Sequence, residues 1–205
     1  MLLHVKGSNK AVRKIVQMAS WYYAEKLMGT RLMGTLSITI NLIRNMSEKT
    51  GCEGSAIWDE WDDFKKTPRD FTIELDCSMS LRNILINLAH EFVHVKQWVK
   101  GDMYEYFRNP SMVRFMKKKY DMNNMDYFDY PWEIEAFGRQ LGLFIRWCED
   151  AGLADREDMM EMDYARLTPI LTAALQEALA EIDTLKTEID IKELEIETLK
   201  KKHEL

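Results

Sequence analysis

The sequence SLRNILINLAHEFVHVKQWVK, residues 80–100, decides the fold. Its apolar residues recur at helical spacing, Ser80 can cap the start of a helix, and Gly101 can end it. The apolar stripe and much of the surface beside it consist of Ile84, Leu85, Ile86, Leu88, Ala89, Phe92, Val93, Val95 and Val99. A helix that is apolar nearly all round is buried between two layers. The sequence therefore predicts a helix that other elements cover on both sides.

Three segments before this helix alternate apolar and polar residues, which is typical of strands with one buried face. They are TLSITINLI (35–43), GSAIWDEWD (54–62) and DFTIELD (70–76), with TPRD (67–70) as a turn. Residues 9–28 predict an N-terminal helix that ends at Gly29. Residues 102–130 are interpreted as irregular, with a basic patch at 117–119, and Pro131 begins another helix. The predicted fold is a small α+β domain with about three strands.

The last segment, from about residue 165 to the end, has a heptad pattern. Its a positions hold Leu175, Ile182, Ile189 and Ile196, and its d positions hold Leu171, Ala178, Leu185, Lys192 and Leu199. Isoleucine at a with leucine at d favours a parallel two-stranded coiled coil. A long helix that packs on its own domain is the alternative. We expect a domain at 1–164 and a helical arm at 165–205 that binds a second copy or a partner helix.

Charge is divided unevenly along the 205 residues, whose formal net charge is −6. Residues 1–50 hold eight Lys or Arg against two Glu, a local charge of +6, so the remainder carries −12. The acidic total argues against a general nucleic-acid-binding protein. The basic N-terminal helix is interpreted as a solvated face, and a docking surface for an acidic partner such as nucleic acid is the alternative.

Cysteine usage and hydropathy indicate the compartment. Cys52, Cys77 and Cys148 are widely separated and form no CxxC pair, which argues against a disulfide framework and against a zinc site built from cysteines. The sequence shows no secretory signal and no apolar run long enough to cross a bilayer. We therefore expect a cytoplasmic protein without a membrane partner.

His90, Glu91 and His94 form an HExxH motif inside the predicted buried helix, directly after a predicted strand. Residues four apart on a helix lie on one face, so both imidazoles can bind one metal ion. Glu91 lies beside the first histidine, where its carboxylate can take a proton from a metal-bound water. A zinc ion that polarises a carbonyl, with such a base beside it, suits the hydrolysis of a protein or peptide substrate.

A catalytic zinc ion needs a third protein ligand and one open position. In the metzincin pattern a histidine would stand where this chain has Lys100, and the remaining histidines, His4 and His203, lie near the termini. We therefore expect a carboxylate ligand from a helix packed over the first. Glu133 and Glu135 are the candidates, and because they are two residues apart on a helix only one of them can face the metal.

HEFVH (90–94) followed by PWEIEA (131–136) resembles the small gluzincin-type zinc metallopeptidases, or minigluzincins, which include metallopeptidases encoded by tailed phages. The resemblance covers about residues 35–148. It implies a three-stranded sheet, an HExxH helix and a second helix that bears a ligand. SprT-type DNA-dependent proteases share HExxH, but they use a third histidine that this sequence lacks.

The resemblance also implies roles for individual residues. In the family pattern E-x-x-A-D, Glu133 corresponds to the ligand that binds Zn²⁺ together with His90 and His94. The sequence departs from this pattern at Phe137, where many members carry an aspartate that supports a histidine. Glu135 therefore stays the alternative third ligand.

The implied mechanism has Glu91 activate the water for attack on a peptide carbonyl and then pass the proton to the leaving amine. The strand Phe71–Asp76 is expected beside the cleft, where an extended substrate could add to it. The candidates for an oxyanion donor are Tyr104, Tyr106, Tyr120, Tyr127 and Tyr130, while Trp98 and Trp132 are interpreted as core residues. The alternative function is a non-catalytic phage structural or host-interaction protein that keeps the metal site.

Overall fold

The computed structural model describes residues 1–58, 67–106, 109–156 and 159, which belong to the first compact unit of the chain, Met1–Met160. The predicted helical arm at 165–205, its coiled coil and the domain boundary at residue 164 lie outside the described residues and stay predictions. Within the described part, none of the helices combines the length and the apolar character that a membrane crossing requires.

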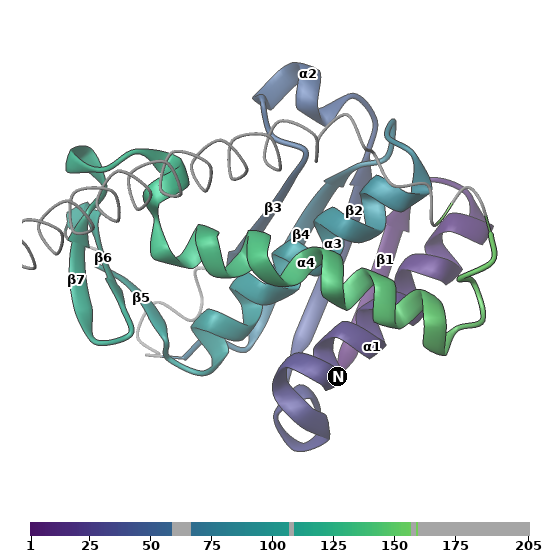
Figure 1. Ribbon diagram of the computed structural model, residues 1–205, viewed down its shortest axis with the longest axis horizontal. Coiled ribbons are helices and arrows are strands. Elements are labelled where there is room, and N and C mark those ends of the chain that lie inside the picture. Colours follow the sequence, from purple (N-terminus) through teal and green to yellow (C-terminus); the bar gives the residue numbers. More distant parts are fainter. Residues whose placement is uncertain (59–66, 107–108, 157–158, 160–205) are drawn as a thin grey trace, which may run out of the picture. The chain divides into compact units, whose positions relative to one another are not determined.

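The unit has a mixed α+β fold, which confirms the predicted class (Figure 1). In chain order the elements are β1 (Leu2–Gly7), α1 (Lys10–Met33), β2 (Ser37–Ile43), α2 (Met46–Thr50), β3 (Gly54–Trp58), β4 (Asp70–Asp76), α3 (Leu81–Val99), β5 (Met103–Tyr106), β6 (Asn109–Phe115), β7 (Lys118–Asp121), the short 3₁₀ turns η2 (Met122–Asn124) and η3 (Tyr127–Asp129), and α4 (Pro131–Asp150).

The main sheet has the strand order β1-β2-β4-β3. β1, β2 and β4 are parallel, and β3 pairs antiparallel with β4 at the edge. The sequence predicts β2, β3 and β4 but not β1. The alternation of β1 is short: Leu3 and Val5 pack against the core, but only as partly buried residues, and no residue of the strand is fully buried. Phe71, Ile73 and Leu75 of β4 are buried, as their alternation predicts.

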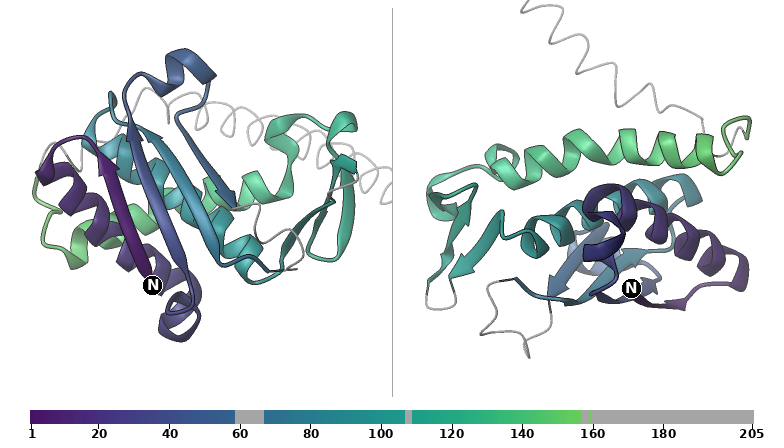
Figure 2. Two further views of the ribbon diagram at one scale, coloured as in Figure 1. Left: turned by 180° about the vertical axis from the view of Figure 1, so that it is seen from behind. Right: turned by 90° about the horizontal axis from the view of Figure 1, so that it is seen from below.

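The helices α1, α3 and α4 cover one face of this sheet (Figures 1 and 2). α3 lies between the sheet and α4, and every residue from Leu88 to Val99 is buried, which confirms the prediction of a helix covered on both sides. Ser80 caps α3, since its hydroxyl accepts a hydrogen bond from the backbone N–H of Asn83. The element that carries HExxH is therefore fixed at the centre of the unit.

Gly29 does not end the first helix as the sequence predicts. α1 continues to Met33, and Gly29 interrupts it with a non-helical backbone (φ 76°, ψ 160°). A positive φ is open to glycine without steric cost, so the residue makes a kink between two helical parts. At the other end, the side chain of Asn9 accepts a hydrogen bond from the N–H of Val12 and caps the helix.

The expectation that residues 102–130 are irregular is wrong. They contain a three-stranded antiparallel sheet with the order β5-β6-β7. Met116 and Lys117 make the tight turn between β6 and β7 with positive φ angles of 48° and 71°, a conformation in which neither residue type is common. Neither residue is of a type that favours a hairpin turn, so this turn could not be predicted from the sequence.

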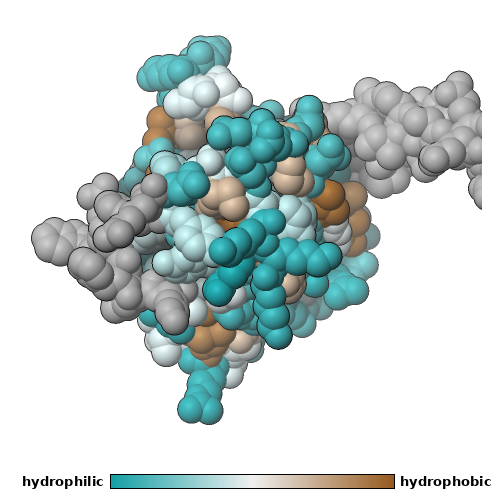
Figure 3. All heavy atoms as spheres, turned by 90° about the vertical axis from the view of Figure 1, so that its left-hand side faces the viewer, coloured by the Kyte–Doolittle hydropathy of each residue, from teal (hydrophilic) through white to brown (hydrophobic). Residues whose placement is uncertain are grey.

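The basic patch at 117–119 lies on this hairpin. Outward-facing Arg114 pairs across strands with Tyr104 and with Lys119, and its guanidinium lies 5.3 Å from the centre of the Tyr104 ring. On the opposite face, Val113 and Phe115 are buried. Figure 3 shows the molecule from the side on which β5–β7 lie, where hydrophilic residues predominate over scattered hydrophobic ones.

Candidate metal centre

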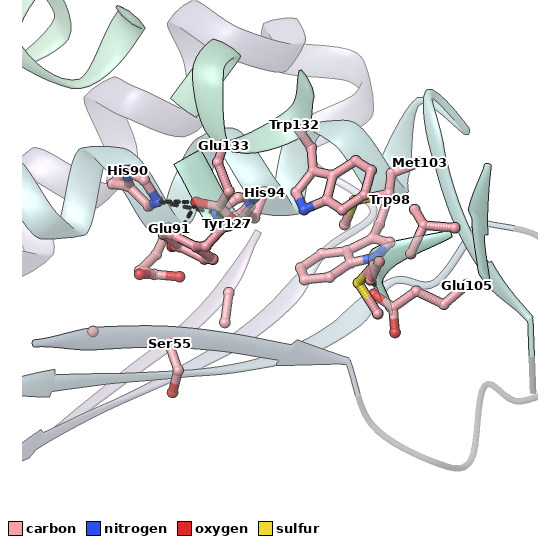
Figure 4. Close-up of a pocket in the computed structure, with 14 residues that line it drawn as sticks. Ser55, His90, Glu91, His94, Trp98, Met103, Glu105, Tyr127, Trp132 and Glu133 are labelled. Carbon is pink, nitrogen blue, oxygen red and sulfur yellow. Dashed lines mark hydrogen bonds and ion pairs between the residues drawn. The ribbon is translucent and has the colours of Figure 1, made fainter. Parts of the chain in front are cut away.

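Two packed helices bring the histidine pair and one glutamate together. His90 and His94 are four residues apart on α3, and their Nε2 atoms lie 3.0 Å from each other. Glu133, in the first turn of α4, places Oε2 3.2 Å from Nε2 of His90 and Oε1 3.5 Å from Nε2 of His94. All three residues are buried, and together they form a group that could hold a metal ion (Figure 4).

The spacing of these donor atoms fits a metal site. In a tetrahedral zinc site with bonds of 2.0–2.2 Å, neighbouring ligand atoms are separated by about 3.3 to 3.6 Å. The observed separations, 3.0, 3.2 and 3.5 Å, lie within this range or slightly below it. Two imidazoles and one carboxylate also form a donor set that zinc accepts, and a fourth position would remain open toward the cavity.

A buried amide orients His94. The side-chain nitrogen of Gln97 donates hydrogen bonds to the carbonyl of Trp132 (2.9 Å) and to Glu135 (3.2 Å). The amide oxygen of Gln97 is therefore left to accept from Nδ1 of His94, 3.0 Å away. With its proton on Nδ1, His94 presents the lone pair of Nε2 to the metal position.

His90 is held in a similar way from α4. Its Nδ1 atom lies 2.8 Å from Oε1 of Gln140. The ring of Phe137 packs edge-on against the imidazole, with the ring centres 4.7 Å apart. At the position where the resembled family often has aspartate, the chain thus has an apolar ring, and an amide one turn further along α4 supplies the hydrogen bond.

Glu135, the alternative third ligand, lies away from the histidines. Its carboxylate accepts hydrogen bonds from Nζ of Lys96 at 2.9 and 3.2 Å and from Nε of Arg139 at 2.9 Å. Lys96 is itself buried and also pairs with Asp102 at 2.8 Å. Burial raises the pKa of Glu135, but the hydrogen bonds from Lys96 and Gln97 outweigh it, and the pKa is lowered. Glu135 is therefore part of an ion-pair cluster behind the site.

The charges within the site depend on one another. Burial raises the pKa of Glu133, but the hydrogen bonds with His90, His94 and Tyr127 lower it by more than burial raises it. The net pKa is below the usual value, so the group is a carboxylate. Burial lowers the pKa of His94, and its hydrogen bond with Glu133 together with the charge of Glu91 raises it overall. The carboxylates thus favour positive charge at the point where the donor atoms converge.

Glu91 is buried beside the same point and lies against the edge of the sheet. A Cβ atom on Gly54, the first residue of β3, would lie only 2.9 Å from Oε1 of Glu91. A glycine at this position therefore makes room for the carboxylate. Burial raises the pKa of Glu91, although the histidines act in the opposite direction.

A cavity of about 320 Å³ opens beside the group. Gly54, Ser55 and Ala56 of β3 line one wall, and side chains of α3, β5, β6 and the start of α4 line the others. Trp98 and Trp132 are buried, as interpreted from the sequence, and they also line this cavity. The expectation that Phe71–Asp76 borders the cleft is wrong, because β4 is paired on both sides and β3 is the strand at the cavity.

The structure distinguishes the five tyrosines between the motifs. Tyr127 lines the cavity, and its hydroxyl donates a hydrogen bond to Oε2 of Glu133 at 2.8 Å. Burial and the carboxylate of Glu133 raise the pKa of Tyr127, so the phenol keeps its proton. Tyr120 and Tyr130 pack on Trp132, whereas Tyr104 and Tyr106 contact each other on β5.

Several residues of the site were not predicted. Gln97 and Gln140 orient the histidines, Gly54 accommodates Glu91, and Glu105 lines the cavity. Helical spacing offered a signal for the two amides, because Gln97 follows His94 by three residues and Gln140 follows Glu133 by seven. Gly54 and Glu105 come from strands whose pairing a single sequence does not reveal.

Comparison of the chain with protein-family models, with curated proteins and with solved structures finds no match. The resemblance to minigluzincins therefore rests on the two motifs.

Proposed function

We propose that this protein is a zinc-dependent metallopeptidase in which His90, His94 and Glu133 hold the ion. The observation that carries the proposal is the convergence of three buried side chains, His90, His94 and Glu133, beside a fourth buried residue, Glu91. The two imidazole Nε2 atoms lie 3.0 Å apart, and each lies 3.2–3.5 Å from one oxygen of the Glu133 carboxylate. The hydrogen bonds to Nδ1 of both histidines support it, because they leave both Nε2 lone pairs free for a metal.

A bound zinc ion would supply a Lewis acid and a water of lowered pKa. Glu91 would serve as general base toward the attacking water and as general acid toward the leaving amine. The backbone of β3 opposite Glu91 keeps this carboxylate at the cavity wall, where a substrate carbonyl has access to it.

β3 supports a binding mode for an extended peptide. It is the edge strand of the main sheet in the described residues, and three of its residues line the cavity. An edge strand offers unpaired N–H and C=O groups along one side, and a peptide that adds to them is held in an extended conformation. The scissile bond would then pass in front of Glu91 and the histidine pair.

Tyr127 is the candidate oxyanion donor. Its hydroxyl is at the cavity wall and within 2.8 Å of Glu133, hence close to the metal position. The phenol has one proton, which it donates to Glu133 in this structure, so the hydroxyl would turn from Glu133 to donate a hydrogen bond to the negative oxygen that develops on the carbonyl during attack.

The test combines metal content with peptide hydrolysis. We expect purified wild-type protein to bind about one equivalent of zinc and to cleave casein or a mixture of peptides. Glu91→Gln should bind zinc equally and lose cleavage, whereas Glu25→Gln, on the exposed surface of α1, should retain both. Protein that binds no zinc would refute the metal centre.

A protein that binds zinc but does not cleave peptides, with wild type and Glu91→Gln behaving alike, would instead favour the non-catalytic alternative. Phe137 in place of an aspartate near His90 is the observation that favours this alternative.

A further inference from the structure

The cavity has a second polar feature, which the metal centre does not use. Glu105 on β5 pairs across strands with Val113, a buried residue, whereas its neighbour Tyr104 pairs with Arg114 on the outer face. Alternation along the strand therefore directs Glu105 to the inner side, and it lines the cavity there. Figure 4 shows Glu105 at one end of the pocket and the histidine pair at the other.

In the described part of the chain, Glu105 accepts a hydrogen bond but has no positively charged partner. The indole Nε1 of Trp98 donates to Oε1 of Glu105 at 3.1 Å. Among the described residues, no salt bridge joins Glu105 to a cation, whereas Glu135 is paired with Lys96 and Arg139. The residue is also exposed to solvent, so a cation that enters the cavity can reach its carboxylate.

The wall between the metal centre and Glu105 is apolar. The ring of Trp98 lies 6.0 Å from the ring of His94, centre to centre, and then reaches Glu105 through its indole nitrogen. Met103, Val113 and Trp132 line the cavity along this wall, and each is buried. An apolar wall that ends at a carboxylate matches a side chain with an aliphatic stem and a positive end.

We propose that this cavity selects substrates with a lysine or arginine beside the scissile bond, and that Glu105 is the residue that determines this specificity. The aliphatic stem would lie on Trp98 and Trp132, where the indole faces also attract a cation, and the charged end would pair with Glu105. This inference rests on the proposed peptidase function.

The first experiment compares three peptides that differ only beside the scissile bond, where they carry lysine, norleucine or glutamate. Norleucine keeps an aliphatic stem and removes the charge. We expect wild type to cleave the lysine peptide with a kcat/KM at least tenfold above that of the norleucine peptide, and the glutamate peptide least. Cleavage sites mapped in a mixture of peptides should likewise be enriched in lysine and arginine.

Variants of Glu105 separate charge from shape. Glu105→Gln keeps an oxygen that can accept from Trp98, so the fold and the zinc content should be unchanged, while the preference for lysine over norleucine should fall to about twofold or less. Glu105→Lys should reverse the preference toward glutamate. Glu25→Gln removes an exposed charge outside the cavity and should leave the preference unchanged.

A binding measurement gives the same information without turnover. In the Glu91→Gln background, fluorescence anisotropy should show tighter binding of the lysine peptide than of the norleucine peptide, and Glu105→Gln should abolish the difference. Cleavage without a basic preference, or with one that Glu105→Gln leaves intact, would overturn the inference and leave the peptidase function standing. A wild type that cleaves no peptide would overturn both.

Discussion

At the scale of single residues, Gly54 of β3 lies close to the carboxylate of Glu91. A Cβ at Gly54 would meet the Glu91 carboxylate at 2.9 Å and the Leu75 side chain at 3.1 Å, both closer than ordinary packing allows. The backbone of β3 therefore determines where the proposed general base can lie.

Gly54→Ala should displace Glu91 while leaving the histidines in place. We expect kcat for peptide cleavage to fall by about tenfold or more, since a small misplacement of a catalytic group is costly, and zinc content to stay unchanged. Gly138→Ala is the matched control, because a Cβ there meets nothing within 4 Å. Equal activity of the two variants would contradict the positioning role of Gly54.

Gln140 offers a test of the histidine support. Gln140→Leu removes the acceptor for Nδ1 of His90, so the imidazole is free to turn and to change tautomer. We expect the affinity for zinc, measured by competition with a chelating dye, to fall by roughly 10- to 100-fold. Gln140→Glu keeps an acceptor and should restore most of the affinity; an affinity that Gln140→Leu leaves unchanged would show that the amide is dispensable.

Tyr127→Phe tests the oxyanion donor. The hydroxyl would act mainly in the transition state, so its removal should lower kcat by about 100-fold and change KM little. Since the hydroxyl also contacts Glu133, zinc content has to be measured in parallel. Tyr130→Phe is the control because Tyr130 packs on Trp132 outside the cavity lining. A change confined to KM would assign Tyr127 to substrate binding instead.

Residue-level prediction succeeded where the relation is local. The spacing of His90 and His94 follows from helix geometry alone, and the structure places both Nε2 atoms together. The sequence could not decide between Glu133 and Glu135 as the third ligand, because the choice depends on how α4 is rotated against α3. The part-buried ion pair of Lys96 with Glu135 and the hydrogen bond from Gln97 to the carbonyl of Trp132 hold α4 in this rotation, and neither has a signature in the sequence.

At the scale of elements, α2 is attached to the end of β4 by one carboxylate. Asp76 is buried and accepts hydrogen bonds from the backbone N–H and the hydroxyl of Ser47, at 2.9 and 2.6 Å, and from the N–H of Ser78 at 2.8 Å. The hydrogen bonds from Ser47 and Ser78 hold the pKa of Asp76 well below its usual range.

Asp76→Asn should therefore destabilise the protein in a pH-dependent way. Because the folded pKa is lowered, the stabilisation is fully present above the unfolded pKa of about 4 and is lost as the pH falls below it. We expect urea unfolding to show a loss of about 2 kcal/mol at pH 7 and a smaller difference from wild type at pH 3. A difference that does not change with pH would argue against the ionised carboxylate as its source.

Elements were predicted where one face is strongly apolar and missed where it is not. β2, β4, α3 and α4 bury alternate or helically spaced residues, so hydropathy marks them. In β5–β7 the inner face has few residues and the outer face carries tyrosines and cations, so the alternation is weak. This small sheet supplies Glu105 and Val113 to the cavity, which is why the sequence did not predict that wall.

At the scale of the whole molecule, the heptads at 165–205 still predict association. Deletion of these residues should lower the oligomeric mass measured by light scattering, because the proposed coiled-coil seam would be removed. An unchanged mass would refute the coiled-coil interpretation. Peptide cleavage by the shortened chain would show whether the arm has any part in activity.

Two contacts join α3 and α4. A metal would join His90 and His94 to Glu133, and Lys96 already forms ion pairs with Glu135 of α4 and with Asp102. The second contact and the apolar core need no ion, so we expect the first unit to fold before a metal binds. Under the proposed function, metal supply would then govern when the protein becomes active, independently of when it is synthesised.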